Sequence, residues 1–223
     1  MGKYDEAVGL MKGRQFNVWE GGARFSVHDN WTDAHLLRGH KHFAAGRYRE
    51  ALVDYQAALE FPAGLQTART RRGGRYQEVA YWVGTAYEAL GQPDKARQSW
   101  QESAAEIPAV GGDDVLPTTD RSVLLYYQAL SLRKLGRAEP AEAIFRELVR
   151  SGSRALQQSP KFDFFAKFGE QQSQRSRLAM AHYIAGLGHL GLNEKEKARQ
   201  ELAAALKASP DHLGAKTALA GIE

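Results

Sequence analysis

Four histidines lie close together near the start of the chain and are the first candidates for metal chemistry. They are His28, His35, His40 and His42. His35 and His42 are seven residues apart, so a helix would place both on one face, where imidazole nitrogens can bind a first-row metal. No carboxylate stands at the usual helical spacing from both, and ordinary core and surface histidines explain the group more simply. We therefore predict no metal site and no cofactor.

Four arginines crowd a second stretch, at Arg69, Arg71, Arg72 and Arg75. Guanidinium groups can clamp phosphate or acidic side chains, but a charge run of this kind is more typical of a solvated loop. The whole chain has a net charge of +4 and a pI near 9.2, a balance too mild to specify a nucleic-acid partner. We predict no nucleic-acid binding.

A carboxylate beside an aromatic ring occurs in Trp19-Glu20-Gly21-Gly22. In an aromatic-lined loop, Glu20 could serve a sugar-processing site that a neighbouring domain completes. The simpler interpretation is that Glu20 caps a helix or turn while Trp19 packs. The chain has no nucleophile elbow, phosphate-binding glycine loop, zinc-protease helix or paired cysteine motif. Binding without catalysis is the prediction, and an accessory region of a carbohydrate-active enzyme is the alternative.

A short phrase recurs five times and defines the elements that position these residues. Each copy runs from a Gly or Asn through a short polar turn to an Ala: Gly2 to Ala7, Gly46 to Ala51, Gly91 to Ala96, Gly136 to Ala141 and Asn193 to Ala198. The closing alanines recur at intervals of 44, 45, 45 and 57 residues, a near-constant period that indicates stacked supersecondary units. Glycine can end one helix with a positive φ, and alanine lets the next helix pack closely. The sequence therefore predicts helix-turn-helix joints repeated along a solenoid.

The unit around each joint resembles the tetratricopeptide repeat (TPR). In the clearest copy the family's small, aromatic, turn, alanine, aromatic and proline positions are occupied by Gly84, Tyr87, Gly91, Ala96, Trp100 and Pro108. The small residues at 39, 84, 129 and 186 let helix backbones approach, and the grooves between helix pairs are filled by Tyr55, Trp100, Phe145 and Leu202. The resemblance implies an all-α fold, a right-handed superhelical TPR-like solenoid of antiparallel helix pairs with long inter-repeat loops.

We expect a single TPR-like solenoid over residues 1–223. Its parts are a half repeat (1–16), four repeats (about 31–62, 75–108, 121–152 and 177–210) and a C-terminal helix (211–223). The period exceeds the family's ~34 residues, so joins follow the second helices at roughly 17–30, 63–74, 109–120 and 152–176. Such insertions map to loops on one edge of a solenoid. The last join contains a Phe-rich run over 162–168 that is too apolar for a solvated loop.

The long joins also resemble the C-terminal TPR portion of large bacterial proteins that carry an upstream domain of unknown function. The phrases that support this resemblance are Phe16 to Gly22, Asp163 to Ala166 and Gly186 to Leu192. On this resemblance Met1 falls inside a repeat whose first helix is absent. The apolar face of a helix over 4–14 would then lack a partner within the chain, so we expect it to fray or to support self-association.

Composition and the distribution of apolar residues indicate where in the cell the protein is located. The 223 residues are 43% hydrophobic and include no Cys, which excludes disulfides and thiolate metal sites. No segment reaches about 18 uninterrupted apolar residues, and the N-terminus has no apolar stretch of signal length. We predict a cytoplasmic protein with no membrane partner.

The concave face formed by the first helices is the predicted binding surface. Alignment of these helices by their small residue gives three rows: Leu36, Tyr81, Tyr126 and Tyr183; His40, Thr85, Leu130 and Leu187; Phe43, Glu88, Arg133 and Leu190. Tyrosine offers stacking area plus a hydroxyl, which suits an extended peptide or a docked helix. The competing interpretation is that the tyrosines pack against Trp82 or Tyr127 in the core. We expect an accessible groove that binds a protein or peptide, with Trp19, Glu20, Arg69, Arg71 and Arg72 as candidates on the loop edge.

Overall fold

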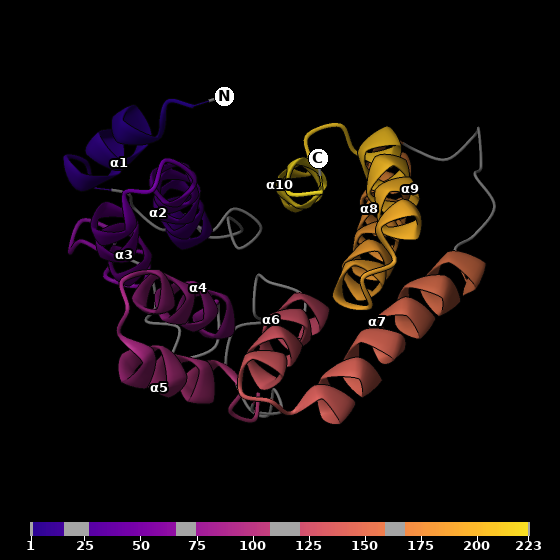
Figure 1. Ribbon diagram of the computed structural model, residues 1–223. Helices are drawn as coiled ribbons and strands as arrows, with labels where there is room; N and C mark the ends of the chain where they lie inside the picture. Colours follow the sequence, from indigo (N-terminus) through magenta and orange to yellow (C-terminus); the bar gives the residue numbers. More distant parts are fainter. Residues whose placement is uncertain (1, 16–26, 66–74, 108–120, 159–167, 223) are drawn as a thin grey trace. The chain divides into compact units, whose positions relative to one another are not determined.

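The computed structural model describes residues 2–15, 27–65, 75–107, 121–158 and 168–222 (Figure 1). Within those ranges it contains ten α-helices and no strand, and 79% of the structure is helical. The predicted all-α, TPR-like class is confirmed. The chain forms two compact units, Met1–Gly136 and Arg137–Glu223. One continuous solenoid over the whole chain stays a prediction.

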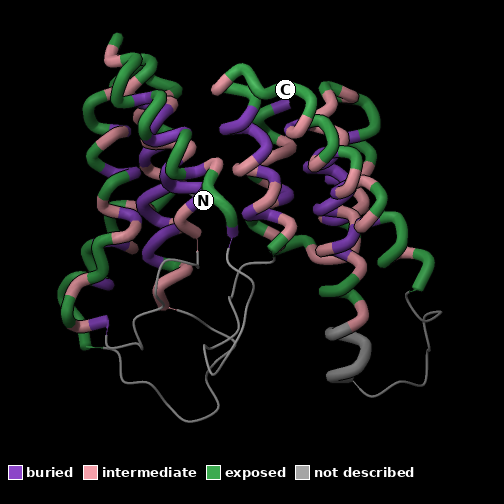
Figure 2. The backbone as a smooth tube through the Cα atoms, turned by 90° about the horizontal axis from the view of Figure 1, so that it is seen from below, coloured by how far each residue is buried: buried purple, intermediate pink, exposed green. Residues whose placement is uncertain are grey.

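The first unit is built from helix pairs. Its described helices are α1 (Tyr4–Lys12), α2 (Val27–Ala44), α3 (Tyr48–Ala57), α4 (Tyr76–Ala89), α5 (Pro93–Ser103) and α6 (Arg121–Lys134). α2 packs on α3 and α4 packs on α5, and α4 also contacts α3 and α6. Because each pair is joined by a short turn, its two helices run antiparallel. Buried positions recur along the helices between exposed ones (Figure 2), which is the pattern of amphipathic helices packed on neighbours.

The predicted turns are present. Their central residues have positive φ: Gly46 (73°), Gly91 (70°), Gly136 (80°) and Asn193 (62°). At Gly46 the backbone N–H donates to the Phe43 carbonyl, and the Arg47 N–H donates to the His42 carbonyl, each over 3.0 Å. This pair of hydrogen bonds is a Schellman motif, and it recurs after α4 and α8. Glycine adopts the required φ without steric cost, and Asn tolerates it better than most residues.

Small residues of one helix face large side chains of the next, as predicted. The contacts are Gly39 with Tyr55, Gly84 with Trp100, and Gly186 with Leu202. A Cβ atom added at Gly84 would lie 2.5 Å from the Trp100 indole nitrogen, and one at Gly186 would lie 2.9 Å from Leu202. Only a residue without a side chain allows this approach.

Helix α1 differs from the expectation that its apolar face lacks a partner within the chain. Val8 and Met11 are buried in a cluster with Trp31, Ala34 and Leu65. α1 packs on α2, and the Leu65 side chain that follows α3 closes the cluster. The expectation of an uncovered stripe is therefore wrong, and self-association loses the observation that motivated it.

Buried hydroxyl groups link the helices of the first unit. The Ser131 hydroxyl of α6 donates to Ser103 Oγ of α5, and Ser103 donates to the Gln77 carbonyl of α4, each over 2.7 Å. In the first helix pair the Thr32 hydroxyl donates to the Ala58 carbonyl over 2.9 Å. The Thr32 bond satisfies a carbonyl at the C-terminal end of α3, and the two serine bonds pair hydroxyl groups that are buried between helices.

The second unit contains α7 (Ala138–Gln158), α8 (Phe168–Gly191), α9 (Lys195–Ala208) and α10 (Leu213–Ala220). α7 packs on α8, α8 packs on α9, and α10 contacts both α8 and α9. The α7 and α8 backbones approach closely at glycines. A Cβ atom at Gly152 would lie 2.6 Å from the Ala181 carbonyl oxygen, and one at Gly188 would lie 2.8 Å from the Phe145 carbonyl oxygen.

The join predicted over 152–176 is partly helical. α7 continues to Gln158 and α8 begins at Phe168, so both helices extend beyond the predicted repeat ends. Gly152, the predicted end of the repeat, still packs closely on Ala181 and Ala185 of α8, and the residues of α7 beyond it are mostly exposed. Most of the Phe-rich run lies outside the described residues.

Candidate polypeptide-binding face

The predicted tyrosine row is mostly packed inside the protein. In the first unit, Leu36 is 2% exposed and Tyr126 is 7% exposed, while Tyr81 is half-buried. In the second unit, Tyr183 is buried with its ring 4.7 Å from that of His212. The expectation that this row is solvent-accessible is wrong for Leu36, Tyr126 and Tyr183.

Core packing against Trp82 and Tyr127, the competing interpretation, explains the tyrosines of the first unit. The Tyr81 ring lies 5.2 Å from Trp82 and 5.8 Å from Tyr127, and the Tyr126 ring lies 5.3 Å from Tyr127. The chain of rings continues to His40, 4.3 Å from Trp82. Tilted and edge-on contacts at these distances are the preferred geometries of aromatic pairs. The rings therefore form a layer that joins α2, α4 and α6.

His40 begins the second predicted row and is held inside this aromatic layer. Its Nδ1 lies 2.9 Å from the Tyr55 hydroxyl. Burial lowers the pKa of His40 to about 4, while Glu78 raises it and Arg75 lowers it by smaller amounts. His40 is therefore neutral at physiological pH and contributes packing and one hydrogen bond, not charge. Burial also raises the pKa of Tyr55, so its hydroxyl stays protonated.

The remaining members of the second and third rows divide by exposure. Leu130 and Leu187 are buried, and Thr85 is half-buried with its hydroxyl donating to the Tyr81 carbonyl over 2.9 Å. Phe43 is half-buried 5.1 Å from the Tyr48 ring.

Glu88 and Arg133 are the exposed members of the predicted rows. Lys134, beside Arg133, donates to Glu88 over 2.5 Å, and its Nζ lies 5.1 Å from the centre of the Trp100 ring. The first unit thus presents a surface strip of Phe43, Tyr81, Thr85, Glu88 and Arg133, which we call the Thr85 face. The Thr85 face combines half-buried rings with charges of both signs.

Arg75 is an ion-pair residue between two helices and not part of a solvated charge run. Its guanidinium contacts Asp33 of α2, and its Nε donates to Glu78 of α4 over 2.7 Å. Burial opposes the charge of Arg75, but Glu78 and Asp33 raise its pKa well above the ordinary value. Burial raises the pKa of Asp33 although Arg75 works against this. Asp33 and Glu78 are 45 residues apart, which equals the repeat interval. This spacing is a signal in the sequence that could have identified the two carboxylates as partners of Arg75.

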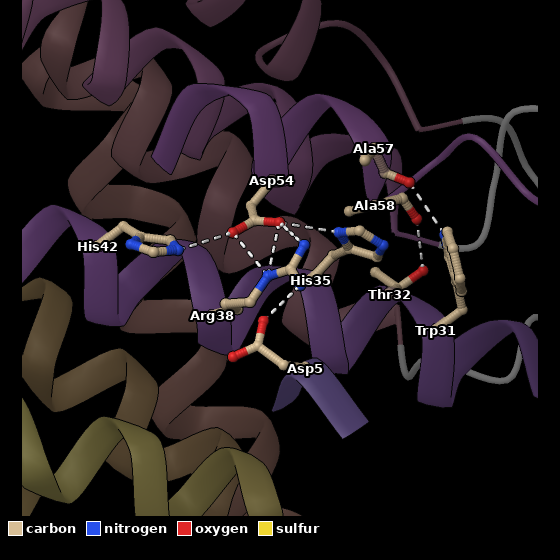
Figure 3. A network of polar contacts seen from close by, with 9 residues as sticks. All are labelled: Asp5, Trp31, Thr32, His35, Arg38, His42, Asp54, Ala57 and Ala58. Atoms are coloured by element: carbon tan, nitrogen blue, oxygen red, sulfur yellow. Dashed lines mark hydrogen bonds and ion pairs between the residues drawn. The ribbon is translucent and has the colours of Figure 1, made fainter. Parts of the chain in front are cut away.

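Two of the four histidines, His35 and His42, contact a carboxylate that the sequence did not reveal (Figure 3). Asp54 of α3 is 3% exposed and lies 3.1 Å from His35 Nδ1 and 3.6 Å from His42 Nε2. Arg38 donates to the same carboxylate over 2.6 to 3.0 Å and reaches Asp5 of α1 over 2.8 Å. Burial opposes ionisation of Asp54, but the hydrogen bonds from His35 and Arg38 outweigh it and lower its pKa. The Arg38 guanidinium therefore supplies positive charge at this carboxylate.

The loop-edge candidates Trp19, Glu20, Arg69, Arg71 and Arg72 lie outside the described residues, so the accessory role beside a carbohydrate-active enzyme stays a prediction. Among the residues that the structure does describe, no three or more His, Cys, Asp or Glu side chains gather in a metal-binding arrangement. In the same ranges no helix is both long enough and apolar enough to span a bilayer.

Comparison with protein families identifies the repeat. The tetratricopeptide repeat model matches residues 78–106 and 124–151. These two segments of the chain match the tetratricopeptide repeat. The first TPR match runs through α4 and α5 and includes Gly84, Gly91, Ala96 and Trp100, the residues that form the turn and the close helix contact described above. TPR repeats are typically non-catalytic modules that bind proteins, and they support the role of a protein–protein interaction scaffold.

Proposed function

We propose that this TPR protein binds a polypeptide segment along the Thr85 face of its first unit. The observation that carries the proposal is the increase in solvent exposure along α4, where Tyr81 and Thr85 are half-buried and Glu88 is exposed. These residues are four and three positions apart, so they lie in line on one side of the helix. A line of this kind can contact a segment for two turns of helix.

The chemistry of the Thr85 face favours a segment with both apolar and charged residues. Phe43 and Tyr81 offer partly exposed rings, which are common anchors in protein interfaces. Glu88 and Arg133 add one charge of each sign at the end of the strip, and opposite charges on a partner would set its direction. The ring layer beneath supports these residues, so little ordering is needed when a partner binds.

Site-specific photocrosslinking tests the location of the site. A benzoylphenylalanine at position 85 sits on the Thr85 face, and this substitution removes the hydrogen bond from Thr85 to the Tyr81 carbonyl of its own helix. The same probe at Gln200, an exposed residue of α9, is the control. We expect a polypeptide to crosslink at 85 and not at 200, and mass spectrometry identifies the contacting segment. Equal yields at the two positions, or no adduct at 85, would contradict the proposal.

A further inference from the structure

A depression in the surface lies on a different side of α4 from the Thr85 face. It has a volume of about 400 Å³ and is bounded by α3, α4 and α5. α4 lies between α3 and α5 (Figure 1) and contributes the floor through Val79, Ala80 and Val83. The walls include Leu59 and Glu60 of the α3 end and Glu102 of α5. We call this depression the α4 slot.

The α4 slot and the Thr85 face point in nearly opposite directions. Successive residues of an α-helix are about 100° apart around its axis, so Val79, Ala80 and Val83 point one way from α4. Tyr81, Thr85 and Glu88 then point about 160° away from them on average. A partner bound at one site would leave the other site open.

Hydrogen bonds hold the walls of the slot to its floor. The Tyr76 hydroxyl of α4 donates to Glu102 of α5 over 2.7 Å. On the other side, the Gln56 amide of α3 donates to the Tyr87 hydroxyl of α4 over 3.2 Å. The floor from Tyr76 to Val83 is about 10 Å long at the helical rise. The slot is therefore a preformed feature with room for one bulky apolar side chain and its flanking residues.

The charge of the slot is one-sided. Among the described residues that line it, Glu60 and Glu102 are charged and none is a lysine, arginine or histidine. Both carboxylates are exposed, and within the described part of the chain neither forms an ion pair. The chain as a whole has a net charge of +4, so the negative charge of this rim is opposite in sign to the net charge of the protein. A cationic ligand would be drawn to the rim and not to the protein in general.

We propose that the α4 slot docks a basic segment of a partner protein, in which one apolar side chain is flanked by lysine or arginine. The apolar side chain of the partner lies on Val79, Ala80 and Val83, and removal of that side chain from water stabilises the complex. The flanking cations form charge-assisted hydrogen bonds with Glu60 and Glu102. The scaffold thus engages two partner segments, one on each side of α4.

A synthetic peptide tests the proposal with the full chain. The probe is fluorescein-labelled Gly-Lys-Lys-Leu-Lys-Lys-Gly, and a second peptide has Ser in place of Leu. Fluorescence anisotropy should show saturable binding of the Leu peptide to the wild type, with weaker binding of the Ser peptide. A Glu60→Lys/Glu102→Lys variant should bind the Leu peptide about tenfold or more weakly.

Matched variants make the test selective. Glu139→Lys/Glu196→Lys carries the same change of net charge on exposed residues of the second unit that do not line the slot, and it should bind the Leu peptide as the wild type does. Glu60→Gln/Glu102→Gln removes the charges with a smaller perturbation, and circular dichroism checks that each variant stays helical. The proposal is overturned if the wild type shows no saturable binding, or if the control pair loses as much affinity as the slot pair.

Two further outcomes distinguish this proposal from self-association through the slot and from binding at the Thr85 face. If the protein self-associates in sedimentation and Glu60→Lys/Glu102→Lys makes it monomeric, the slot belongs to a second copy of the chain and the proposal is wrong. A Glu88→Arg variant on the Thr85 face should leave binding of the Leu peptide unchanged. Failure of either binding site therefore leaves the test of the other intact.

Discussion

The Arg38 guanidinium of α2 binds the buried Asp54 carboxylate of α3 through two of its nitrogens, with N–O distances of 2.6 to 3.0 Å. The same guanidinium bonds Asp5 of α1 over 2.8 Å, so one cation connects three helices. A buried charge that loses its partner is strongly destabilising, because nothing compensates its removal from water. This relationship makes Asp54 the polar residue on which the N-terminal helices most depend.

Asp54→Asn should lower the free energy of unfolding of the first unit by about 1–3 kcal/mol, because the buried hydrogen bonds are disrupted while the part-exposed Arg38 keeps Asp5 as a partner. The amide keeps the shape of the side chain but leaves Arg38 without its buried counter-charge. Asp94→Asn, at an exposed position in the first turn of α5, should change stability by about 0.5 kcal/mol or less. Urea unfolding followed by circular dichroism measures both. Similar losses in the two variants would show that the Asp54 network does not hold the helices.

His40 should make the protein less stable as the pH falls below neutrality. Its pKa is about 4 in the folded protein and near 6.5 when unperturbed. Between these values the unfolded chain binds a proton that the folded protein does not, so stability falls as the pH falls through this window. The wild type should lose up to about 3 kcal/mol more than His40→Phe, which cannot titrate, between pH 7 and pH 4.

Urea midpoints of the wild type and His40→Phe at both pH values provide the measurement. The other buried histidines are present in both proteins, so the difference reports His40 alone. An equal loss of stability in the two proteins would mean that His40 is not kept neutral by the fold.

The same substitution should have opposite effects at two helical glycines. At Gly84 of α4 an added Cβ would lie 2.5 Å from Trp100 Nε1 and 3.1 Å from the Ala96 carbonyl, so Gly84→Ala should destabilise by about 1–3 kcal/mol. At Gly9 of α1 it would meet nothing within 4 Å, so Gly9→Ala should stabilise by up to about 1 kcal/mol. Thermal melts decide between the two signs. A neutral Gly84→Ala would show that the close approach of α4 and α5 is not required.

The helix pairs could be predicted because they depend on local signals. The turns at Gly46 and Gly91 require a positive φ that a repeated Gly reveals, and the Gly84 contact with Trp100 follows from the spacing of the repeat. The Asp54 network could not be found in this way. A search along one helix for a carboxylate near His35 and His42 fails, because Asp54 belongs to the next helix and the antiparallel turn brings it back.

The exposure of the tyrosines also depends on information that spacing does not contain. Alignment of the repeats correctly placed Tyr81 and Tyr126 at equivalent positions of α4 and α6. It did not establish which way their rings turn, because that depends on Trp82 and Tyr127, the next residue in each helix, which offer aromatic partners across the helix contact. Arg75 was misread for a similar reason, since its two carboxylate partners lie on different helices.

The affinity of the polypeptide segment crosslinked at position 85 tests the central proposal most directly. Isothermal titration of that segment as a synthetic peptide would compare the wild type with Glu88→Arg, Arg133→Glu and the slot variant Glu60→Lys/Glu102→Lys. We expect each Thr85-face variant to weaken binding by about tenfold or more, because it reverses a charge beside the bound segment, while the slot variant binds as the wild type does. Unchanged affinity in both Thr85-face variants, with their helical circular dichroism intact, would contradict binding at this face.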